Sequence, residues 1–397
     1  MNIGIFTDTY FPQINGVSTS THLLERELTA LGHNVSVFTT TDPKAAPEPH
    51  VYRMPSMPFA FLPDRRVGLA YPPNVLMKIR KLKLDIVHTH TEFSLGVFGK
   101  VVSEFSRIPL VHTFHTMYED YVHYVANGRL VSPKMARNIT RLFCNRAKAV
   151  ITPAEKARDY LLASGVKRPV RVIPTGIDFG PFSPQTYGAG EIAELRRSLG
   201  VRPDERVILS LGRVAKEKSV DVLIRGMPEI LTKLPNAKLV IVGDGPARPE
   251  LQTLAANMGL ENSVVFTGER PWTQIGRYYL IGDVFACASV TETQGLTYVE
   301  AMAAGLPVVA KFDRSIEKLV RNGETGYTFL NDDEFPALVT GVLADGAGAR
   351  QTAARAMESI SRLSSKQFAL NVERLYAKVM RLPRPGFFKS VWMRIRR

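Results

Sequence analysis

Cysteine and long apolar runs are both scarce in this sequence. Only Cys144 and Cys287 occur among 397 residues, which is too few for a disulfide framework and lacks the close spacing of a metal motif. No apolar run approaches the roughly 18 to 20 residues that a membrane-spanning helix needs. The first residues also lack the basic segment and apolar core of a signal peptide. We therefore expect a protein of the reducing cytosol.

Acidic residues are fewer than basic ones, and two segments of the chain contain none. Lys and Arg number 51 against 37 Asp and Glu, a net charge of +14. Two segments, 121–154 and 381–397, contain no acid and together carry twelve of these charges. Charge concentrated in this way indicates an anionic partner, either a nucleic acid or a membrane surface. No zinc-finger spacing or other nucleic-acid-reading motif accompanies it, so the sequence favours a membrane.

Apolar residues accompany the basic ones in both segments, as expected for a chain lying in a lipid headgroup region. Between positions 133 and 147 one helical stripe consists of Met135, Ile139, Leu142 and Phe143. The alternative for this segment is a surface helix that packs its stripe against the domain. The residues predicted to contact the membrane are Lys134, Arg137, Arg141, Arg384, Phe387, Phe388, Lys389, Trp392, Arg394, Arg396 and Arg397.

The order of strand-like and helical patterns predicts two α/β domains. Strand-like runs occupy positions 2–7, 35–40, 85–90, 109–115, 149–153, 170–174, 206–212, 237–243, 263–268, 284–289 and 307–310. Helical patterns occupy positions 20–31, 94–105, 219–233, 246–258, 271–281, 296–304 and 366–380. A region rich in turn formers, 175–190, separates the two halves. Alternation of this kind builds parallel sheets covered by helices.

We therefore predict two Rossmann-like, doubly wound domains that face each other across a cleft. The first spans 1–180 on the acceptor and membrane side, and the second, 181–365, binds a nucleotide. A helix and basic tail, 366–397, follow. Ligands of open α/β sheets bind at the carboxyl ends of the strands, so functional motifs are expected where strands end.

In the first half, two groups of residues follow strand-like runs. Gly16 lies just ahead of a helix, where a phosphate could approach backbone N–H groups, although such a glycine is also common punctuation in a loop. Four histidines cluster at two strand ends: His88, His90, His112 and His115. Strand alternation separates these side chains poorly for tetrahedral metal ligation. We interpret them as core or cleft residues, with His115 best placed to reach a ligand.

In the second half, Arg213 and Lys218 lie on a loop after the first strand. Two permanent cations there could bind a pyrophosphate, most strongly as charge develops on it when it leaves, although a basic loop is more often solvated surface. Gly243 and Gly245 begin a dinucleotide-like fingerprint, but Arg248 occupies the position of its third glycine. This departure disfavours a nicotinamide enzyme and favours a tight turn.

The most specific string begins at Glu292 and ends beyond Glu300, within a predicted helix. Gly295, Leu296 and Thr297 open that helix, and their backbone N–H groups would form an anion site. The carboxylates of Glu292 and Glu300 could each accept hydrogen bonds from neighbouring hydroxyls of a sugar or ribose. Two acids that flank a glycine-opened helix are less easily explained as solvated surface than a single helical glutamate.

These motifs together resemble the retaining glycosyltransferases of the GT-B type over nearly the whole chain. The resemblance implies that Gly16 approaches the donor phosphate and that Arg213 and Lys218 bind the diphosphate. It further implies that Glu292 holds hydroxyls of the transferred sugar, Glu300 holds the ribose, and His115 lies beside the donor sugar.

Three strings, at 5–17, 88–96 and 115–121, more narrowly resemble bacterial 1,2-diacylglycerol 3-α-glucosyltransferases. That group implies UDP-glucose as donor, diacylglycerol as acceptor and a peripheral location on the cytoplasmic face of the membrane. It also implies anionic lipids as partners and no nucleic acid. No paired-aspartate site is evident, so nothing in the sequence requires Mg²⁺ or another cofactor. The residues themselves do not separate glucose from galactose.

Three alternatives stay open from the sequence. A related enzyme could use UDP-galactose or another lipid acceptor, such as phosphatidylinositol or glucosyldiacylglycerol. A non-catalytic nucleotide-sugar binder would have little reason to keep Arg213, Lys218, Glu292 and Glu300 together. A dinucleotide-dependent oxidoreductase is disfavoured by Arg248.

Overall fold

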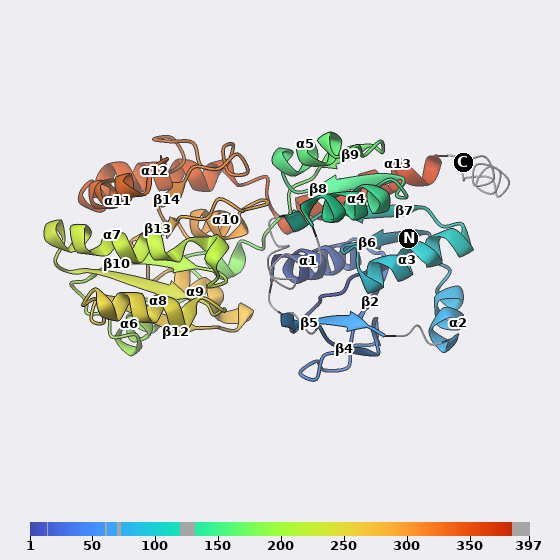
Figure 1. The fold of residues 1–397 in the computed structure, drawn as a ribbon, viewed down its shortest axis with the longest axis horizontal. Helices are drawn as coiled ribbons and strands as arrows, with labels where there is room; N and C mark the ends of the chain where they lie inside the picture. Colours follow the sequence, from blue (N-terminus) through green and yellow to red (C-terminus); the bar gives the residue numbers. More distant parts are fainter. Residues whose placement is uncertain (14, 60–61, 70–72, 120–131, 383–397) are drawn as a thin grey trace. The chain divides into compact units, whose positions relative to one another are not determined.

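The structure is a computed structural model that describes residues 1–13, 15–59, 62–69, 73–119 and 132–382. The chain divides into two compact units, shown in Figure 1. Unit 1 consists of Met1–Gly176 together with Ser365–Arg397, and unit 2 consists of Ile177–Ser364. Each unit contains a parallel sheet with helices on its faces, so the prediction of two α/β domains is confirmed.

Unit 1 is built on a parallel sheet of seven strands in the order β3-β2-β1-β6-β7-β8-β9. The strands are β1 (Asn2–Phe6), β2 (Asn34–Thr40), β3 (Val51–Met54), β6 (Ile86–Thr89), β7 (Leu110–Thr113), β8 (Ala149–Thr152) and β9 (Val170–Val172). Strands β6, β7 and β8 are buried along their whole length, which explains why their sequences do not alternate with polar residues. A separate antiparallel hairpin is formed by β4 (Ser56–Phe59) and β5 (Leu62–Gly68).

Helices cover both faces of this sheet. On one face, a core cluster joins the strands to α1 (Gly16–Ala30) and α13 (Ser365–Arg381). On the other face, a second cluster joins them to α2 (Pro73–Leu82), α3 (Ser94–Ser106), α4 (Pro133–Cys144) and α5 (Glu155–Ala163). The two clusters follow from strand geometry, since successive side chains point to opposite faces: Ile5 belongs to the first cluster and Phe6 to the second.

Unit 2 is built on a six-stranded parallel sheet in the order β12-β11-β10-β13-β14-β15. The strands are β10 (Arg206–Leu211), β11 (Ala237–Val242), β12 (Val264–Gly268), β13 (Val284–Cys287), β14 (Val308–Lys311) and β15 (Tyr327–Phe329). The helices are α6 (Ala189–Ser198), α7 (Val220–Lys233), α8 (Arg248–Asn257), α9 (Ile275–Tyr279), α10 (Leu296–Ala303), α11 (Phe335–Ala344) and α12 (Gly346–Ser359). Two core clusters, one on each face, hold this unit together.

The last helix belongs to unit 1 although it follows unit 2 in the chain. Phe368, Val372 and Tyr376 of α13 pack into the cluster that contains α1 and β1. The Tyr376 hydroxyl also forms a 2.6 Å hydrogen bond with Nδ1 of His88, a buried residue of β6. A buried polar pair of this kind is specific in geometry, so it fixes α13 to one register on the sheet.

Helix α4 presents its predicted apolar stripe outward. The buried side of the helix carries Ala136, Thr140 and Phe143, whereas Met135, Ile139 and Leu142 are 51%, 50% and 62% exposed. The alternative that this stripe packs against the domain is therefore wrong, except for Phe143. Among the described residues, no helix combines the length and apolarity that a membrane crossing requires.

Candidate donor-binding residues

Gly16, Arg213, Lys218 and Glu292 follow strands at which the order of their sheet reverses, whereas His115 follows β7, one strand further along. In unit 2 the chain runs outward from β10 through β11 to β12, and outward again from β13 through β14 to β15. Neighbouring strands β10 and β13 therefore form a topological switch point, where open α/β sheets bind ligands. The β10 loop carries Arg213 and Lys218, and the β13 loop carries Glu292. In unit 1 the same reversal falls between β1 and β6, whose loops carry Gly16 and His90.

Two of the predicted residues in unit 2 contact each other directly. Nζ of Lys218 donates a hydrogen bond to Oε1 of Glu292 at 2.6 Å. Both side chains are largely shielded, with exposures of 23% and 14%. Arg213 is near the carboxylate of Glu217, at 3.6 Å. The two loops thus bring alternating charges to the ends of β10 and β13, as binding of a diphosphate and a polyol requires.

The neighbouring loop after β11 supports the backbone that carries Arg213. The N–H of Val214 donates to the carbonyl of Asp244 at 2.9 Å, and that of Gly212 donates to Val242 at 3.0 Å. Gly243 has φ of +136°, and a Cβ there would lie 1.9 Å from the carbonyl oxygen of Gly212. The glycine is therefore required by close approach of two backbones. This confirms the tight turn that was predicted in place of a dinucleotide fingerprint.

Helix α10 has an N-terminus that no side chain caps. Its N-cap is Gly295, with φ of +75° and no side-chain capping hydrogen bond. A Cβ at Gly295 would lie 2.4 Å from the ring of Tyr298. Leu296 and Thr297 form the first turn and are half-buried. An uncapped helix N-terminus is suited to an anion, because its first N–H groups lack intrahelical acceptors.

Glu300 lies in the same helix and is buried. Its Oε2 accepts a hydrogen bond from the Tyr279 hydroxyl at 2.6 Å. Burial raises the pKa of Glu300 to about 7, although the Tyr279 hydrogen bond favours the charged form. A carboxylate with this pKa changes charge near neutral pH, so its ability to accept two hydroxyl hydrogen bonds depends on pH.

In unit 1, Gly16 is the first residue of α1. A Cβ at Gly16 would meet no atom within 4 Å. The helix is capped by Asn15, whose Oδ1 accepts hydrogen bonds from the N–H groups of Val17 and Ser18 at 3.1 and 3.0 Å. Those two N–H groups are already used, so an approaching phosphate has open space at Gly16 itself but competes with the cap beyond it.

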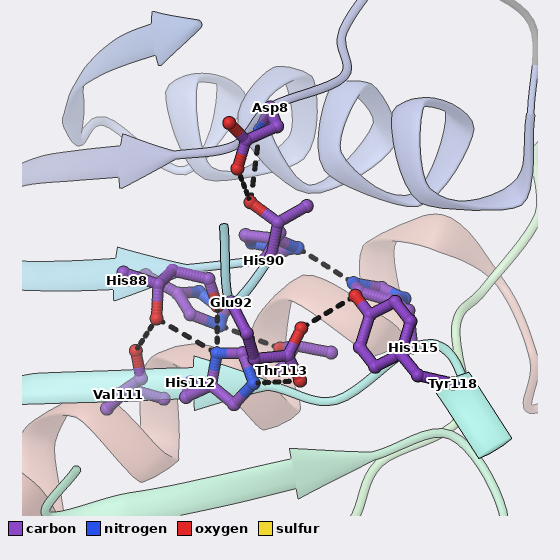
Figure 2. Close-up of polar contacts among 11 residues, drawn as sticks. Asp8, His88, His90, Glu92, Val111, His112, Thr113, His115 and Tyr118 are labelled. Carbon is purple, nitrogen blue, oxygen red and sulfur yellow. Dashed lines mark hydrogen bonds and ion pairs between the residues drawn. The ribbon is translucent and has the colours of Figure 1, made fainter. Parts of the chain in front are cut away.

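The four histidines lie close together, as Figure 2 shows: His88, His90 and His112 are buried, and His115 is half-buried. Nδ1 of His90 and Nε2 of His115 are 3.0 Å apart, and the two rings stack. Burial, with a smaller contribution from His112, lowers the pKa of His115 to about 3. His115 is therefore a neutral imidazole at physiological pH, able to donate or accept a hydrogen bond but not to act as a cation.

Sequence reasoning missed three polar residues in this part of unit 1: Asp8, Glu92 and Tyr118. Glu92 accepts a hydrogen bond from the Tyr118 hydroxyl at 2.7 Å and pairs with Nε2 of His112 at 3.2 Å. Asp8 accepts hydrogen bonds from the Thr91 hydroxyl at 2.5 Å and from the N–H at position 95 at 3.0 Å, so it ties the β1 loop to the start of α3. Their position after β1, β6 and β7 is the signal that could have found them.

The predicted membrane-contacting residues are only partly described. Lys134, Arg137 and Arg141 lie on α4, where Arg137 donates hydrogen bonds to both carboxylate oxygens of Glu119. The others lie outside the described residues: Arg384, Phe387, Phe388, Lys389, Trp392, Arg394, Arg396 and Arg397.

Known proteins resemble both units of this chain. Two family models match: Glycosyltransferase Family 4 over residues 14–180 and Glycosyl transferases group 1 over residues 191–359. The structure superimposes on HepE of Anabaena in complex with UDP-glucose with a TM-score of 0.77. That alignment is 21% identical and covers 95% of this chain and 99% of HepE. The fold is thus that of the GT-B glycosyltransferases.

Two curated relatives are closer in sequence. Alpha-monoglucosyldiacylglycerol synthase of Streptococcus pneumoniae is 37% identical over 95% of this chain and 85% of its own length. The protein of the same name from Acholeplasma laidlawii is 38% identical over 84% of this chain and 86% of its own length. The chain belongs to the glycosyltransferase family that contains both synthases.

Proposed function

We propose that this glycosyltransferase moves glucose from UDP-glucose to the 3-hydroxyl of 1,2-diacylglycerol with retention, forming α-monoglucosyldiacylglycerol. The names of the two synthases support the substrates. The observation that carries the proposal is the Lys218–Glu292 ion pair at the β10/β13 switch point, followed by the uncapped start of α10. It joins a cation for phosphate, a carboxylate for sugar hydroxyls and an anion site within one pair of loops.

In the proposed reaction, the bond between the anomeric carbon and the UDP oxygen breaks, and a bond to the acceptor oxygen forms on the same face of the sugar. The acceptor proton passes to the departing phosphate. Negative charge grows on the diphosphate as the bond breaks, so Arg213, Lys218 and the first N–H groups of α10 stabilise the transition state more than the ground state. No covalent nucleophile is needed.

Other residues of the proposal bind and position the donor. Glu292 accepts hydrogen bonds from hydroxyls of the sugar, and Glu300 accepts them from the ribose. Gly16 approaches the donor phosphate. His115 lies beside the donor sugar, where its neutral imidazole exchanges hydrogen bonds with hydroxyls rather than competing with the cations for the diphosphate.

The acceptor requires contact with a membrane, and α4 supports this. Its three exposed apolar residues lie beside Lys134, Arg137 and Arg141. Each basic residue near an anionic leaflet contributes on the order of 1 kcal/mol to binding. We place the enzyme at the cytoplasmic membrane face as a peripheral protein.

The decisive experiment offers radiolabelled UDP-glucose and UDP-galactose with a panel of three acceptors: diacylglycerol, phosphatidylinositol and glucosyldiacylglycerol. We expect transfer of glucose to diacylglycerol. Preferential use of UDP-galactose, or of another lipid, would replace the proposal by the corresponding alternative. Absence of transfer with preserved UDP-glucose binding would indicate a non-catalytic binder.

Lys218→Ala and Glu292→Gln test the donor site itself. Each removes one partner of the shielded pair, and each should lose most transfer activity while the protein stays folded. Lys233→Ala is a matched control, because Lys233 forms a 3.2 Å pair with Glu229 on the exposed side of α7. Near-normal turnover of both site variants would remove the proposed donor site.

A further inference from the structure

Four charged side chains on the loops after β10 and β13 form two ion pairs. Nζ of Lys218 lies 2.6 Å from Oε1 of Glu292, and Nη1 of Arg213 lies 3.6 Å from Oε1 of Glu217. The Glu217 side chain is 5% exposed, so water solvates its carboxylate poorly. Each cation that the proposal assigns to the diphosphate is therefore next to a carboxylate of the chain itself, and the formal charges of the four groups cancel.

Hydrogen bonds to the backbone hold these two pairs together. The Thr291 hydroxyl, on the β13 loop, donates a 3.2 Å hydrogen bond to the carbonyl of Glu217, on the β10 loop. The N–H of Lys218 donates to the carbonyl of Ala215 at 3.0 Å, at the end of a short 3-10 helix, Lys216–Lys218. The two loops are thus joined independently of the ion pairs. We expect both carboxylates to stay beside the cations when a ligand binds.

This balance of charge matters because the donor and the product of the proposed reaction differ in charge. The outer phosphate of UDP is terminal and loses its second proton with a pKa of about 6, whereas the outer phosphate of UDP-glucose is esterified. UDP therefore carries more negative charge than UDP-glucose at neutral pH. A site with excess positive charge would favour UDP, and carboxylates that balance the cations reduce that preference.

The sugar gives UDP-glucose a second advantage at Glu292. In the proposed site this carboxylate accepts hydrogen bonds from hydroxyls of the glucose, which compensate its charge while the donor is bound. UDP lacks these hydroxyls, and its phosphates compete with Glu292 for Lys218. A shielded charged group that loses its partner disfavours the complex. Glu292 therefore favours UDP-glucose and disfavours UDP.

We propose that Glu217 and Glu292 make this site select UDP-glucose over the product UDP, by holding Arg213 and Lys218 in ion pairs that a diphosphate must weaken. The inference rests on the proposed function, in which UDP is the product. Glu217 acts through Arg213 and is a positioning residue, whereas Glu292 contacts the sugar. The consequence for turnover is faster release of UDP, which frees the site for the next donor.

Glu217→Gln tests the first pair, with the binding of UDP and of UDP-glucose measured separately by calorimetry. The amide keeps the shape of the side chain but removes the charge that opposes Arg213. We expect the Kd of UDP to fall about tenfold and that of UDP-glucose to fall less, because UDP carries the larger negative charge. A ratio of the two Kd values equal to that of the wild type would contradict the role of Glu217.

Glu292→Gln tests the second pair and should change the two affinities in opposite directions. The Kd of UDP should fall about tenfold, because a carboxylate no longer faces the diphosphate. The Kd of UDP-glucose should rise, because an amide binds the sugar hydroxyls less strongly than a carboxylate does. Weaker binding of both ligands would mean that Glu292 only maintains the shape of the site, and would overturn its role in selection.

Glu250→Gln is the matched control. It removes the same charge from a carboxylate that lies 3.8 Å from Lys216, also on the β10 loop, but both side chains of this pair are largely exposed. Its Kd values should stay within about twofold of those of the wild type, because solvent and salt screen exposed charges. Tighter UDP binding in this control, equal to that in Glu217→Gln, would show a general effect of net charge and overturn the inference.

A transfer assay separates this inference from the proposed function. Added UDP should inhibit transfer more strongly in Glu217→Gln than in the wild type. If the wild type transfers no glucose but the Kd values change as described, the proposed function fails and the selection between the two ligands stands. If transfer to diacylglycerol proceeds and the Kd ratios stay constant, the proposed function stands and this inference fails. A wild type that binds neither ligand would overturn both.

Discussion

The substitution Gly16→Ala can separate an effect on protein stability from an effect on donor binding. No atom lies within 4 Å of a Cβ added there, and alanine is the better residue in a helix. Gly16→Ala should therefore keep or slightly raise the melting temperature. If a donor phosphate approaches this position, the KM for UDP-glucose should rise tenfold or more, equivalent to at least about 1.4 kcal/mol.

Gly190→Ala is the matched control for this substitution, since Gly190 also lies in the first turn of a helix with no atom within 4 Å of its Cβ position. Both variants should show similar melting temperatures. An unchanged KM in Gly16→Ala would remove Gly16 from the donor site.

The raised pKa of Glu300 predicts that donor binding depends on pH. Its raised pKa of about 7 means that the carboxyl becomes protonated as pH falls through neutrality, and in the proposed site it would then accept hydrogen bonds from ribose hydroxyls poorly. The KM for UDP-glucose should rise below about pH 7, approaching tenfold per pH unit. Steady-state kinetics in Glu300→Gln should lose this pH dependence. The same profile in both proteins would assign it to another group.

The same shift has an opposite consequence for the free protein. A carboxyl whose pKa is raised in the folded state stabilises the fold below its ordinary pKa, and this contribution is lost as pH rises through about 7. The free enzyme should thus lose stability toward neutral pH where it gains donor affinity. Thermal unfolding of the wild type and of Glu300→Gln across this range measures the difference.

The loop after β11 contributes no proposed ligand, but we expect it to affect activity because it supports the loop that carries Arg213. Gly243→Ala would force a Cβ against the Gly212 carbonyl and displace the loop that carries Arg213. We expect a loss of kcat of at least tenfold together with about 1 to 3 kcal/mol of stability. Gly259→Ala is the control: its φ is also positive, but its Cβ position is open. Equal kcat values in the two variants would contradict support of Arg213 by this loop.

The strands and their functional loops were largely predictable from the sequence. The runs at 206–212 and 237–243 correspond to β10 (Arg206–Leu211) and β11 (Ala237–Val242). These strands can be recognised in the sequence because strands buried on both faces are continuous apolar runs, and the loops after them carry glycines and charges. The sequence also placed Lys218 and Glu292 each at the carboxyl end of a strand, whereas the pairing of those strands, β10 and β13, and the contact between the two side chains come from the structure.

Other elements could not be predicted in the same way. Periodicity located the stripe of α4 but not its direction, because the helix packs inward through small residues, Ala136 and Thr140. Helix α6 (Ala189–Ser198) was not predicted: it begins at the end of the turn-rich region 175–190, glycines lie at its start and no side chain caps it. The contact of Asp8 with Thr91 joins residues far apart in the chain, and no local pattern encodes it.

The division of the chain into two units predicts that α13 contributes to the stability of unit 1 and not to that of unit 2. Tyr376→Phe removes the hydroxyl bound to Nδ1 of His88 and leaves a buried polar atom without its partner. Unfolding free energy should fall by about 1 to 3 kcal/mol. Amide hydrogen exchange should place the loss in β6 and α13 while unit 2 keeps its protection.

Tyr327→Phe provides the comparison in unit 2, because its hydroxyl donates a longer, 3.2 Å hydrogen bond to Thr352 in a partly buried position. Its effect should be smaller and confined to unit 2. A loss spread equally over both units in Tyr376→Phe would contradict a local role for α13.

The return of α13 to unit 1 also sets an order of events during synthesis. The chain emerges from the ribosome with its N-terminus first, and a domain completes its folding as a unit once its last element has emerged. Unit 2 is continuous and is complete once Ser364 has emerged, whereas unit 1 lacks a helix of its core until Val379 follows. The first domain to be translated is therefore the last to finish folding, and the part of its apolar sheet face that α13 covers stays exposed while the second domain is synthesised.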